Sequence, residues 1–179
     1  MKKHLFLLLI LLVSTNSFAQ KGMSKNKKAI VNSIENHKKN LIEISDNIWE
    51  AAEPALLEFK SSGYLSDYAE ENGFTVKKGV AGIETAFIAE YGSGKPIIGI
   101  MGEFDANLGI SQKKQPTKDP LKKGAPGHGC GHNLFGTASL GAAIAIKEMI
   151  EAGEISGTVR FYGTPAEETI FGKVWMVRE

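Results

Sequence analysis

The stretch GTVRFYGTPAEE, Gly157–Glu168, decides the fold class of this chain. Its first eight residues mix branched and aromatic side chains, which is typical of a strand, and Pro165 ends that strand. A helix rich in alanine and leucine comes before it; Asn133 is a good N-cap residue for this helix, which ends near Gly153. Another strand-like run, Pro96–Met101, precedes the helix. These three elements predict a β-strand, α-helix, β-strand unit, and if its strands are parallel the connection is right-handed.

The residues before this unit predict further helices and strands. Apolar residues recur at helical spacing between residues 24 and 59, where Pro54 should start a new turn or kink the helix. The remaining expected elements are a helix over 64–71, strands over 74–79 and 85–91, a turn at 92–94 and a long loop over 103–131. The order of these elements places the chain in the α/β class.

Three polar segments are expected to meet at one edge of the sheet. They are GEFD at 102–105, GHGCGH at 127–132 and PAEE at 165–168. The crossover helix starts near the carboxyl end of the first strand of the unit, and the last segment follows the carboxyl end of the second. Ligand sites in open α/β sheets gather at those ends, so this edge is the predicted functional site.

Cys130 is the only cysteine of the chain, so it forms no internal disulfide. It lies two residues before His132 in a glycine-rich turn, where both side chains can point to one centre. A thiolate and an imidazole suit zinc and similar metals. Two alternatives are a glycine-rich turn with incidental polar residues, and a cysteine nucleophile with His128 or His132 as its base. Neighbouring carboxylates disfavour the nucleophile because they raise the pKa of a thiol.

Four acidic residues follow the two strands at the same edge. Glu167 and Glu168 are adjacent and point in different directions, so one can bind a metal while the other acts as a general base. Glu103 and Asp105 share one face of their strand end, and Asp105 can orient a metal ligand through a hydrogen bond. The alternative for both is a carboxylate that caps a loop.

The amino terminus has the pattern of a secretory signal peptide. Basic residues are followed by an apolar run of nine residues and by small residues near Ala19, so residues 1–19 are expected to be removed and the protein exported to the periplasm or secreted. An uncleaved anchor is the alternative. The formal net charge of +1 favours neither nucleic acid nor, after signal cleavage, a membrane as partner.

Together, the motifs GAPGHGCGHNLFGTASLGAA, GTVRFYGTPAEE and GKVWMVR resemble the metal-dependent amidohydrolase and metallopeptidase family of aminoacylase and carboxypeptidase type. Within it, they are most similar to the aminobenzoyl-glutamate utilization subgroup, and the resemblance spans residues 46–178. It implies a zinc-peptidase-like α/β/α catalytic domain with a mixed sheet. It also implies two divalent ions, manganese or zinc, and hydrolysis of an amide bond in an N-acyl or N-aroyl amino acid or a dipeptide by metal-activated water.

The resemblance also implies roles for individual residues. Cys130, His132 and Glu168 would be metal ligands, with Cys130 bridging the two ions as a thiolate. Glu167 would be the general base. One departure is Leu108, which stands where the subgroup usually has proline, so a loop of different shape is expected after Asp105.

The family resemblance further implies that residues 20–179 are the amino-terminal portion of the catalytic domain, without the lid or dimerisation domain. No histidine follows His132, so these residues offer too few ligands for two metal ions, and we expect the polypeptide itself to be inactive. The alternative is a non-catalytic remnant with at most a weak single-metal site. A full-length parent would take a small-molecule amide substrate and form a homodimer or hetero-oligomer. The lysines of residues 113–123 are expected to form a solvated loop rather than a site for a substrate carboxylate.

Overall fold

The structure is a computed structural model that describes residues 23–179. The predicted signal peptide, residues 1–19, lies outside these residues. Within the described part of the chain, no helix combines the length and the apolar character needed to cross a membrane.

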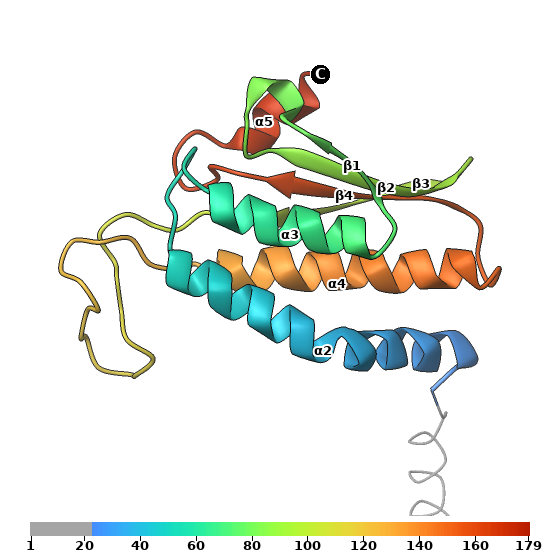
Figure 1. Ribbon diagram of the computed structural model, residues 1–179, viewed down its shortest axis with the longest axis horizontal. Helices are drawn as coiled ribbons and strands as arrows, with labels where there is room; N and C mark the ends of the chain where they lie inside the picture. Colours follow the sequence, from blue (N-terminus) through green and yellow to red (C-terminus); the bar gives the residue numbers. More distant parts are fainter. Residues whose placement is uncertain (1–22) are drawn as a thin grey trace, which may run out of the picture.

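One mixed sheet of four strands organises the molecule (Figure 1). Its strands are β1 (Thr75–Lys78), β2 (Phe87–Ser93), β3 (Ile97–Glu103) and β4 (Gly157–Thr164), in the spatial order β1-β2-β4-β3. β3 and β4 are parallel and in register from the Ile97–Thr158 pair to the Glu103–Thr164 pair, whereas β2 is antiparallel to β4. The predicted β-strand, α-helix, β-strand unit and the α/β class are therefore confirmed.

The predicted turn between β2 and β3 differs from the structure. β2 continues through Gly92 and Ser93. β4 then lies between β2 and β3, so the two strands that are consecutive in sequence are not neighbours in the sheet. Sequence spacing alone gave no sign of this, because the strand that separates them begins more than fifty residues after the end of β3.

The first helix agrees with one of the two alternatives predicted for Pro54, whereas the second helix begins earlier than predicted. α2 (Lys25–Ala51) ends before Pro54 is reached, so the proline starts a new turn rather than a kink. α3 (Phe59–Glu71) begins five residues earlier than expected. The reason is Glu53, whose carboxylate accepts hydrogen bonds from the backbone N–H groups of Lys60 and Ser61 at 3.1 and 2.8 Å. A side chain upstream of the helix thus satisfies donors of its first turn.

α4 (His132–Glu151) contradicts the prediction that Asn133 is its N-cap. The cap is Gly131, whose positive φ of 83° is accessible to glycine at little cost. Asn133 lies inside the first turn, and its side-chain amide donates to the hydroxyl of Ser45 on α2 at 3.1 Å. The histidine expected in the loop is therefore the first residue of the helix. A final helix, α5 (Gly172–Val177), was not predicted.

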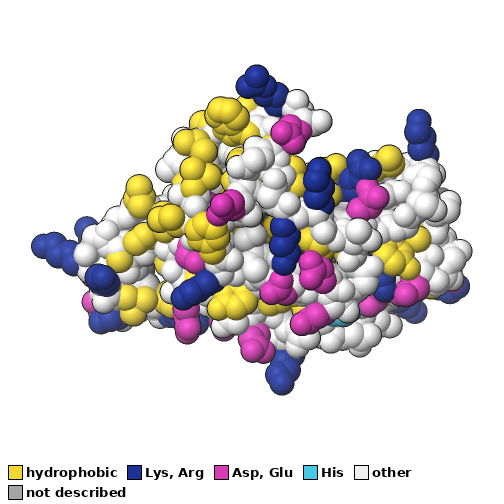
Figure 2. Space-filling view, turned by 45° about the horizontal axis from the view of Figure 1, so that its top comes forward, with side chains coloured by type: hydrophobic (Ala, Val, Ile, Leu, Met, Phe, Trp, Pro, Cys, Tyr) yellow, Lys and Arg dark blue, Asp and Glu magenta, His cyan; other side chains and the backbone are white. Residues whose placement is uncertain are grey.

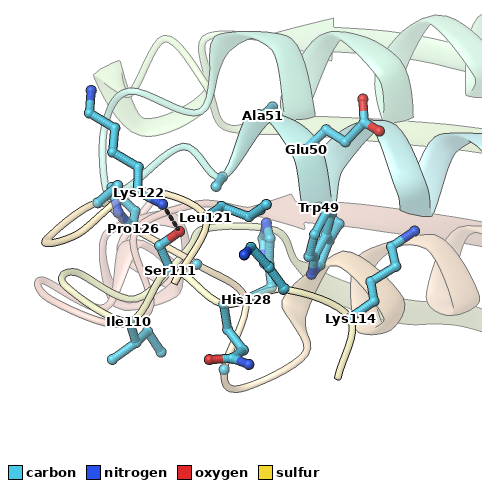
Figure 3. Close-up of a pocket in the computed structure, with 16 residues that line it drawn as sticks. Trp49, Glu50, Ala51, Ile110, Ser111, Lys114, Leu121, Lys122, Pro126 and His128 are labelled. Carbon is cyan, nitrogen blue, oxygen red and sulfur yellow. Dashed lines mark hydrogen bonds between the residues drawn. The ribbon is translucent and has the colours of Figure 1, made fainter. Parts of the chain in front are cut away.

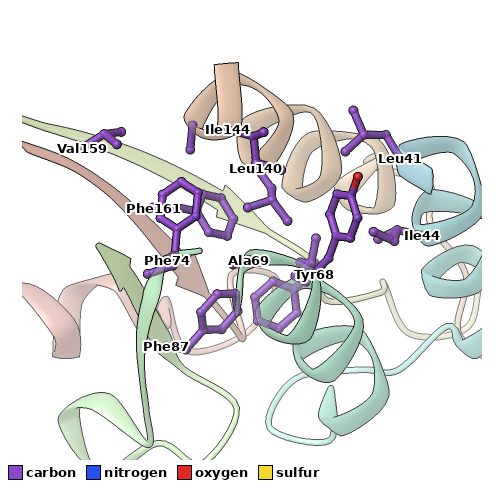
Figure 4. Close-up of a cluster of buried hydrophobic side chains, with 14 of the residues drawn as sticks. Leu41, Ile44, Tyr68, Ala69, Phe74, Phe87, Leu140, Ile144, Val159 and Phe161 are labelled. Atoms are coloured by element: carbon purple, nitrogen blue, oxygen red, sulfur yellow. The ribbon is translucent and has the colours of Figure 1, made fainter. Parts of the chain in front are cut away.

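Helices α2, α3 and α4 form two layers on one face of the sheet. α3 and α4 contact the sheet directly, while α2 packs against α4 and α3 (Figure 1). Aromatic and aliphatic side chains from these elements fill the space between them, as Figure 4 shows. The fully buried members of this core are Ile48, Leu65, Ala69, Phe87, Ala89, Phe104, Leu140, Ala143 and Val159, together with Phe161.

The opposite face of the sheet is more open. Of the described elements, α5 and the short 3-10 helix η2 (Val80–Gly82) lie over one end of it (Figure 1). Figure 2 shows hydrophobic side chains gathered near that end, with charged side chains spread over the rest of the visible face. α5 itself exposes Val174 and Trp175.

Candidate metal centre

The three polar segments predicted to converge do so at the carboxyl ends of β3 and β4. Glu103 is the last residue of β3, and Glu167 and Glu168 follow β4 after Pro165. His132 opens α4, directly after the turn that carries Cys130. Ligand atoms from these five residues form two overlapping groups, described below.

A close approach between α4 and β3 brings the imidazole to this edge. A Cβ atom on Gly136 would lie 2.6 Å from the carbonyl oxygen of Glu103, and one on Gly102 would lie 2.8 Å from the Cα of Gly136. Any larger residue at Gly136 would push the helix away. Because His132 lies one turn earlier on α4, this contact places its ring over the end of β3.

Asp105 fixes the orientation of the His132 ring. Nδ1 of His132 lies 3.0 Å from Oδ1 of Asp105 and 3.1 Å from the Asp105 carbonyl oxygen. Both oxygens can only accept hydrogen bonds, so Nδ1 carries a proton, and Nε2 points the other way, toward Glu103. Asp105 thus orients the ring so that Nε2 faces the carboxylates of Glu103, Glu167 and Glu168.

Burial and charge oppose each other in this pair. Burial lowers the pKa of His132, but the hydrogen bond to Asp105 and the nearby carboxylates outweigh it and raise that pKa. Burial raises the pKa of Asp105, but its hydrogen bonds with His132 and with the backbone N–H of Glu168 outweigh that effect and lower it. The Glu168 N–H donates to Oδ2 of Asp105 at 2.9 Å, so one carboxylate holds both the imidazole and the acidic loop.

Two groups of metal-binding atoms share the His132 side chain. The first is Cys130, His132 and Glu168, and the second is Glu103, His132 and Glu167; within each group the ligand atoms lie within 4.8 Å of one another. Nε2 of His132 is 3.1 Å from Glu103, 3.7 Å from Glu168 and 3.9 Å from Glu167. The Glu103 carboxylate, expected to lie under the site, is thus part of a ligand group itself.

The residues fit a divalent cation. Oε1 of Glu168 is buried and has no hydrogen-bond partner among residues 23–179. A buried carboxylate oxygen without a partner is costly unless a cation binds it. Thiolate, imidazole and carboxylate together are a donor set that zinc uses in proteins.

The surroundings of Cys130 oppose a role as nucleophile. Desolvation of the sulfur and the negative charges of Glu168, Glu167 and Glu103 raise the pKa of its thiol. A nucleophilic cysteine needs a lowered pKa. His128, one of the two candidate bases, is engaged elsewhere, because its Nε2 donates to the carbonyl oxygen of Ile48 at 3.0 Å. Cys130 itself is exposed, as an accessible metal ligand can be.

Two residues near the site were missed by the sequence reasoning. Glu58 is fully buried, and its carboxylate accepts hydrogen bonds from the backbone N–H of Ala166 at 2.8 Å and from the Thr85 hydroxyl at 3.1 Å. Ala166 has a positive φ of 59°, so Glu58 holds a strained residue directly before Glu167. The signal in the sequence was a single acidic residue between Leu57 and Phe59.

Lys173 of α5 is the second missed residue. Its Nζ contacts Oε1 of Glu103 and lies 3.6 Å from Oε1 of Glu167. Its only signal was its place in the GKVWMVR motif.

The lysine-rich segment lies beside a pocket of about 390 Å³ (Figure 3). Lys113 pairs with Asp119 at 2.7 Å, and Nζ of Lys114 lies 3.5 Å from Asp46 and 4.9 Å from the centre of the Trp49 ring. In Figure 3, Lys114 extends beside Trp49, with its ammonium group directed outward. These pairs fit the predicted solvated loop.

Comparison with known proteins gives consistent results. No protein-family model matches the sequence. The chain is 46% identical to a subunit of the p-aminobenzoyl-glutamate hydrolase of Escherichia coli K12 over 160 residues, which are 88% of this chain and 33% of that protein. The chain thus spans about a third of the length of this relative.

Solved structures show the same fold. A dinuclear metal-binding peptidase of the M20 family from Bacillus subtilis matches with a TM-score of 0.58 and 25% identity, over 73% of this chain and 36% of that one. An aminobenzoyl-glutamate utilization protein from Klebsiella pneumoniae also has a TM-score of 0.58, at 14% identity, over 83% of this chain and 42% of that one. Over the part of their length that it covers, the chain is thus similar in sequence to a subunit of an aminobenzoyl-glutamate hydrolase and in fold to a dinuclear metal-binding peptidase.

Proposed function

We propose that residues 20–179 are the amino-terminal portion of a catalytic domain that hydrolyses the amide bond of an N-acyl or N-aroyl amino acid, such as aminobenzoyl-glutamate, or of a dipeptide. The observation that carries this proposal is the pair of ligand groups that share His132 at the carboxyl ends of β3 and β4. The name and the 46% identity of the Escherichia coli relative support the substrate class.

The proposed cofactors are two divalent ions, zinc or manganese. Cys130, His132 and Glu168 would hold one ion, and the thiolate favours zinc at that position. A bound divalent ion polarises the carbonyl of an amide and lowers the pKa of water. The similarity to a dinuclear metal-binding peptidase from Bacillus subtilis supports the number of ions.

Glu167 is the proposed general base. Its side chain is 28% exposed, compared with 20% for Glu168, so an entering substrate can reach the Glu167 carboxylate. Its carboxylate would accept a proton from the attacking water and pass it to the leaving amine. The adjacent Glu168 is held by the backbone bond to Asp105 and faces the cysteine, which separates the roles of the two glutamates.

For the 179-residue polypeptide itself we propose negligible hydrolysis. Among residues 23–179, the candidate ligands are two groups that share one imidazole, which are too few to hold two ions firmly. The second candidate function is therefore a weak single-metal site without catalysis, favoured by the complete Cys130, His132 and Glu168 group.

Two further proposals concern the cellular context. The basic and apolar pattern of residues 1–19 supports export to the periplasm or secretion. The Escherichia coli relative is named as one subunit of a hydrolase, which supports an oligomeric parent protein, either a homodimer or a hetero-oligomer.

A chimera tests the proposed function. Residues 20–179 would replace the aligned third of the Escherichia coli relative, and hydrolysis of aminobenzoyl-glutamate would be measured together with metal content. We expect activity in the chimera and a decrease in kcat of about 100-fold or more on Glu167→Gln, with the ion held by Cys130, His132 and Glu168 retained. Glu71→Gln, an exposed carboxylate on α3, is the matched control. Full activity in the Glu167→Gln chimera would show that the general base is another group.

A further inference from the structure

Lys173 contacts one oxygen of each of two carboxylates, those of Glu103 and Glu167. Its Nζ contacts Oε1 of Glu103 and is 3.6 Å from Oε1 of Glu167. The other oxygen of each carboxylate faces Nε2 of His132, at 3.1 Å for Glu103 and 3.9 Å for Glu167. The ammonium group therefore lies on the outer side of the acidic group, and the imidazole lies on the inner side.

The acidic group needs positive charge. Glu103, Asp105, Glu167 and Glu168 all lie within 4 Å of the His132 ring nitrogens. Among residues 23–179, Lys173 is the only lysine or arginine that pairs with any of these four carboxylates. Its side chain is 28% exposed and that of Glu103 is 11% exposed, so solvent screens the pair only in part.

We propose that Lys173 is a built-in counter-cation of the metal centre. It neutralises part of the acidic group in the metal-free protein, and the same positive charge weakens the binding of a divalent ion to that group. This inference rests on the proposed metal site and assigns Lys173 a role that the motif match did not supply. Lys173 is a positioning residue, because it acts on the ligand carboxylates rather than on substrate.

A purely structural role for Lys173 gives the opposite result for metal binding. If the lysine only anchored α5 to the end of β3, its loss would loosen the site and reduce both stability and metal affinity. As a counter-cation, its loss reduces the stability of the metal-free protein, because like charges are left unpaired, but increases the affinity for a divalent ion. The two roles therefore differ in the sign of one measured change.

The test is a titration of the full 179-residue chain with Co²⁺ alone, followed by visible absorption, beside urea unfolding of the metal-free protein. We expect Lys173→Met to bind Co²⁺ about three- to ten-fold more tightly than the unsubstituted chain. Lys173→Arg keeps the charge and should stay within about two-fold. Lys78→Met is the matched control, since Lys78 also bridges two carboxylates. Its Nζ lies 2.8 Å from Asp67 and 3.7 Å from Glu70, and neither carboxylate belongs to the metal site.

Each outcome of the Co²⁺ titration supports or overturns the proposed role of Lys173. Unchanged or weaker Co²⁺ binding by Lys173→Met overturns the counter-cation role while leaving the metal site in place. Absence of Co²⁺ binding by the unsubstituted chain overturns the proposed metal site and, with it, this inference. If Lys173→Met does not fold without metal, its recovery by Co²⁺ supports the role, whereas failure to fold in both conditions assigns Lys173 to the scaffold.

Discussion

At the scale of single residues, the site contains carboxylates that have different roles although they lie close together. Asp105 holds the His132 ring and the Glu168 backbone, whereas Glu103 and Glu167 face the free nitrogen of that ring. The difference comes from where each carboxylate lies relative to β3 and β4 rather than from its chemistry. Glu58 lies outside the ligand groups, and its carboxylate accepts a hydrogen bond from the backbone N–H of Ala166, directly before Glu167.

Glu58 makes stability depend on pH. Burial, opposed by hydrogen bonds to Ala166 and Thr85, raises the pKa of this carboxyl above its ordinary value of 4.5. The folded state therefore binds this proton more tightly than the unfolded state, so the contribution of Glu58 is fully present below pH 4.5 and is lost as pH rises through the folded pKa. We expect the stability of the unsubstituted chain relative to Glu58→Gln to fall as pH rises from 4.5.

Urea unfolding of the two proteins across that pH range checks the prediction. Glu35→Gln serves as the control, because Glu35 is an exposed carboxylate on α2 that, among residues 23–179, pairs only with Lys38. A stability difference between the chain and Glu58→Gln that is flat with pH, or that grows as pH rises, would contradict a raised pKa at Glu58.

At the scale of elements, the approach of α4 to β3 aligns the site. The contact occurs at Gly136 and Gly102, where backbone meets backbone, so the helix cannot rotate or rise without moving His132 away from Asp105. The same helix is held from outside by α2, through the bond between Asn133 and Ser45. The position of His132 thus depends on packing of the whole helix.

Gly136→Ala tests this contact. The added Cβ would lie 2.6 Å from a backbone carbonyl oxygen, so the helix must shift, and we expect a loss of about 1 to 3 kcal/mol in the free energy of unfolding. Gly63→Ala in α3 is the matched control: nothing lies within 4 Å of its Cβ, and alanine favours helix, so it should be neutral or stabilising by up to about 1 kcal/mol. Equal thermal unfolding of the two variants would contradict the close approach.

At the scale of the whole molecule, β3 leaves one edge of the sheet without a partner strand among the described residues. Ile97, Ile98 and Met101 on this strand are each about half exposed, at 48%, 48% and 47%. An exposed apolar edge strand presents free backbone groups to other chains. The 179-residue polypeptide should therefore associate with itself.

We expect sedimentation velocity to show oligomers of the chain at micromolar concentration. The double variant Ile97→Lys with Met101→Lys should shift the distribution toward the monomer, because charges on an edge strand oppose pairing. Leu108→Lys, which adds the same charge at an exposed loop position, should leave it unchanged. A monomeric chain at all concentrations would contradict the prediction.

Sequence reasoning recovered the β3-α4-β4 unit because hydrophobic runs and Pro165 mark strands and helices locally, although the helix begins at His132, after Gly131, rather than after Asn133. It also brought Cys130, His132 and the two glutamates to one edge, since parallel strands end together. Sequence reasoning failed where the start of a helix or the order of the strands depends on a residue or strand outside that element. The early start of α3 depends on Glu53, and the sheet order depends on β4 entering between β2 and β3.

The central claim is that Cys130, His132 and Glu168 bind one divalent ion. Equilibrium dialysis of the 179-residue chain against Zn²⁺, with metal content measured by mass spectrometry, tests it directly. We expect weak binding that approaches one ion per chain at saturation, and an affinity at least about ten-fold lower for Cys130→Ser, since even partners outside the ligand shell contribute about that much. Cys130 is exposed, so this variant should stay folded. Unchanged affinity and stoichiometry in Cys130→Ser would contradict the assignment.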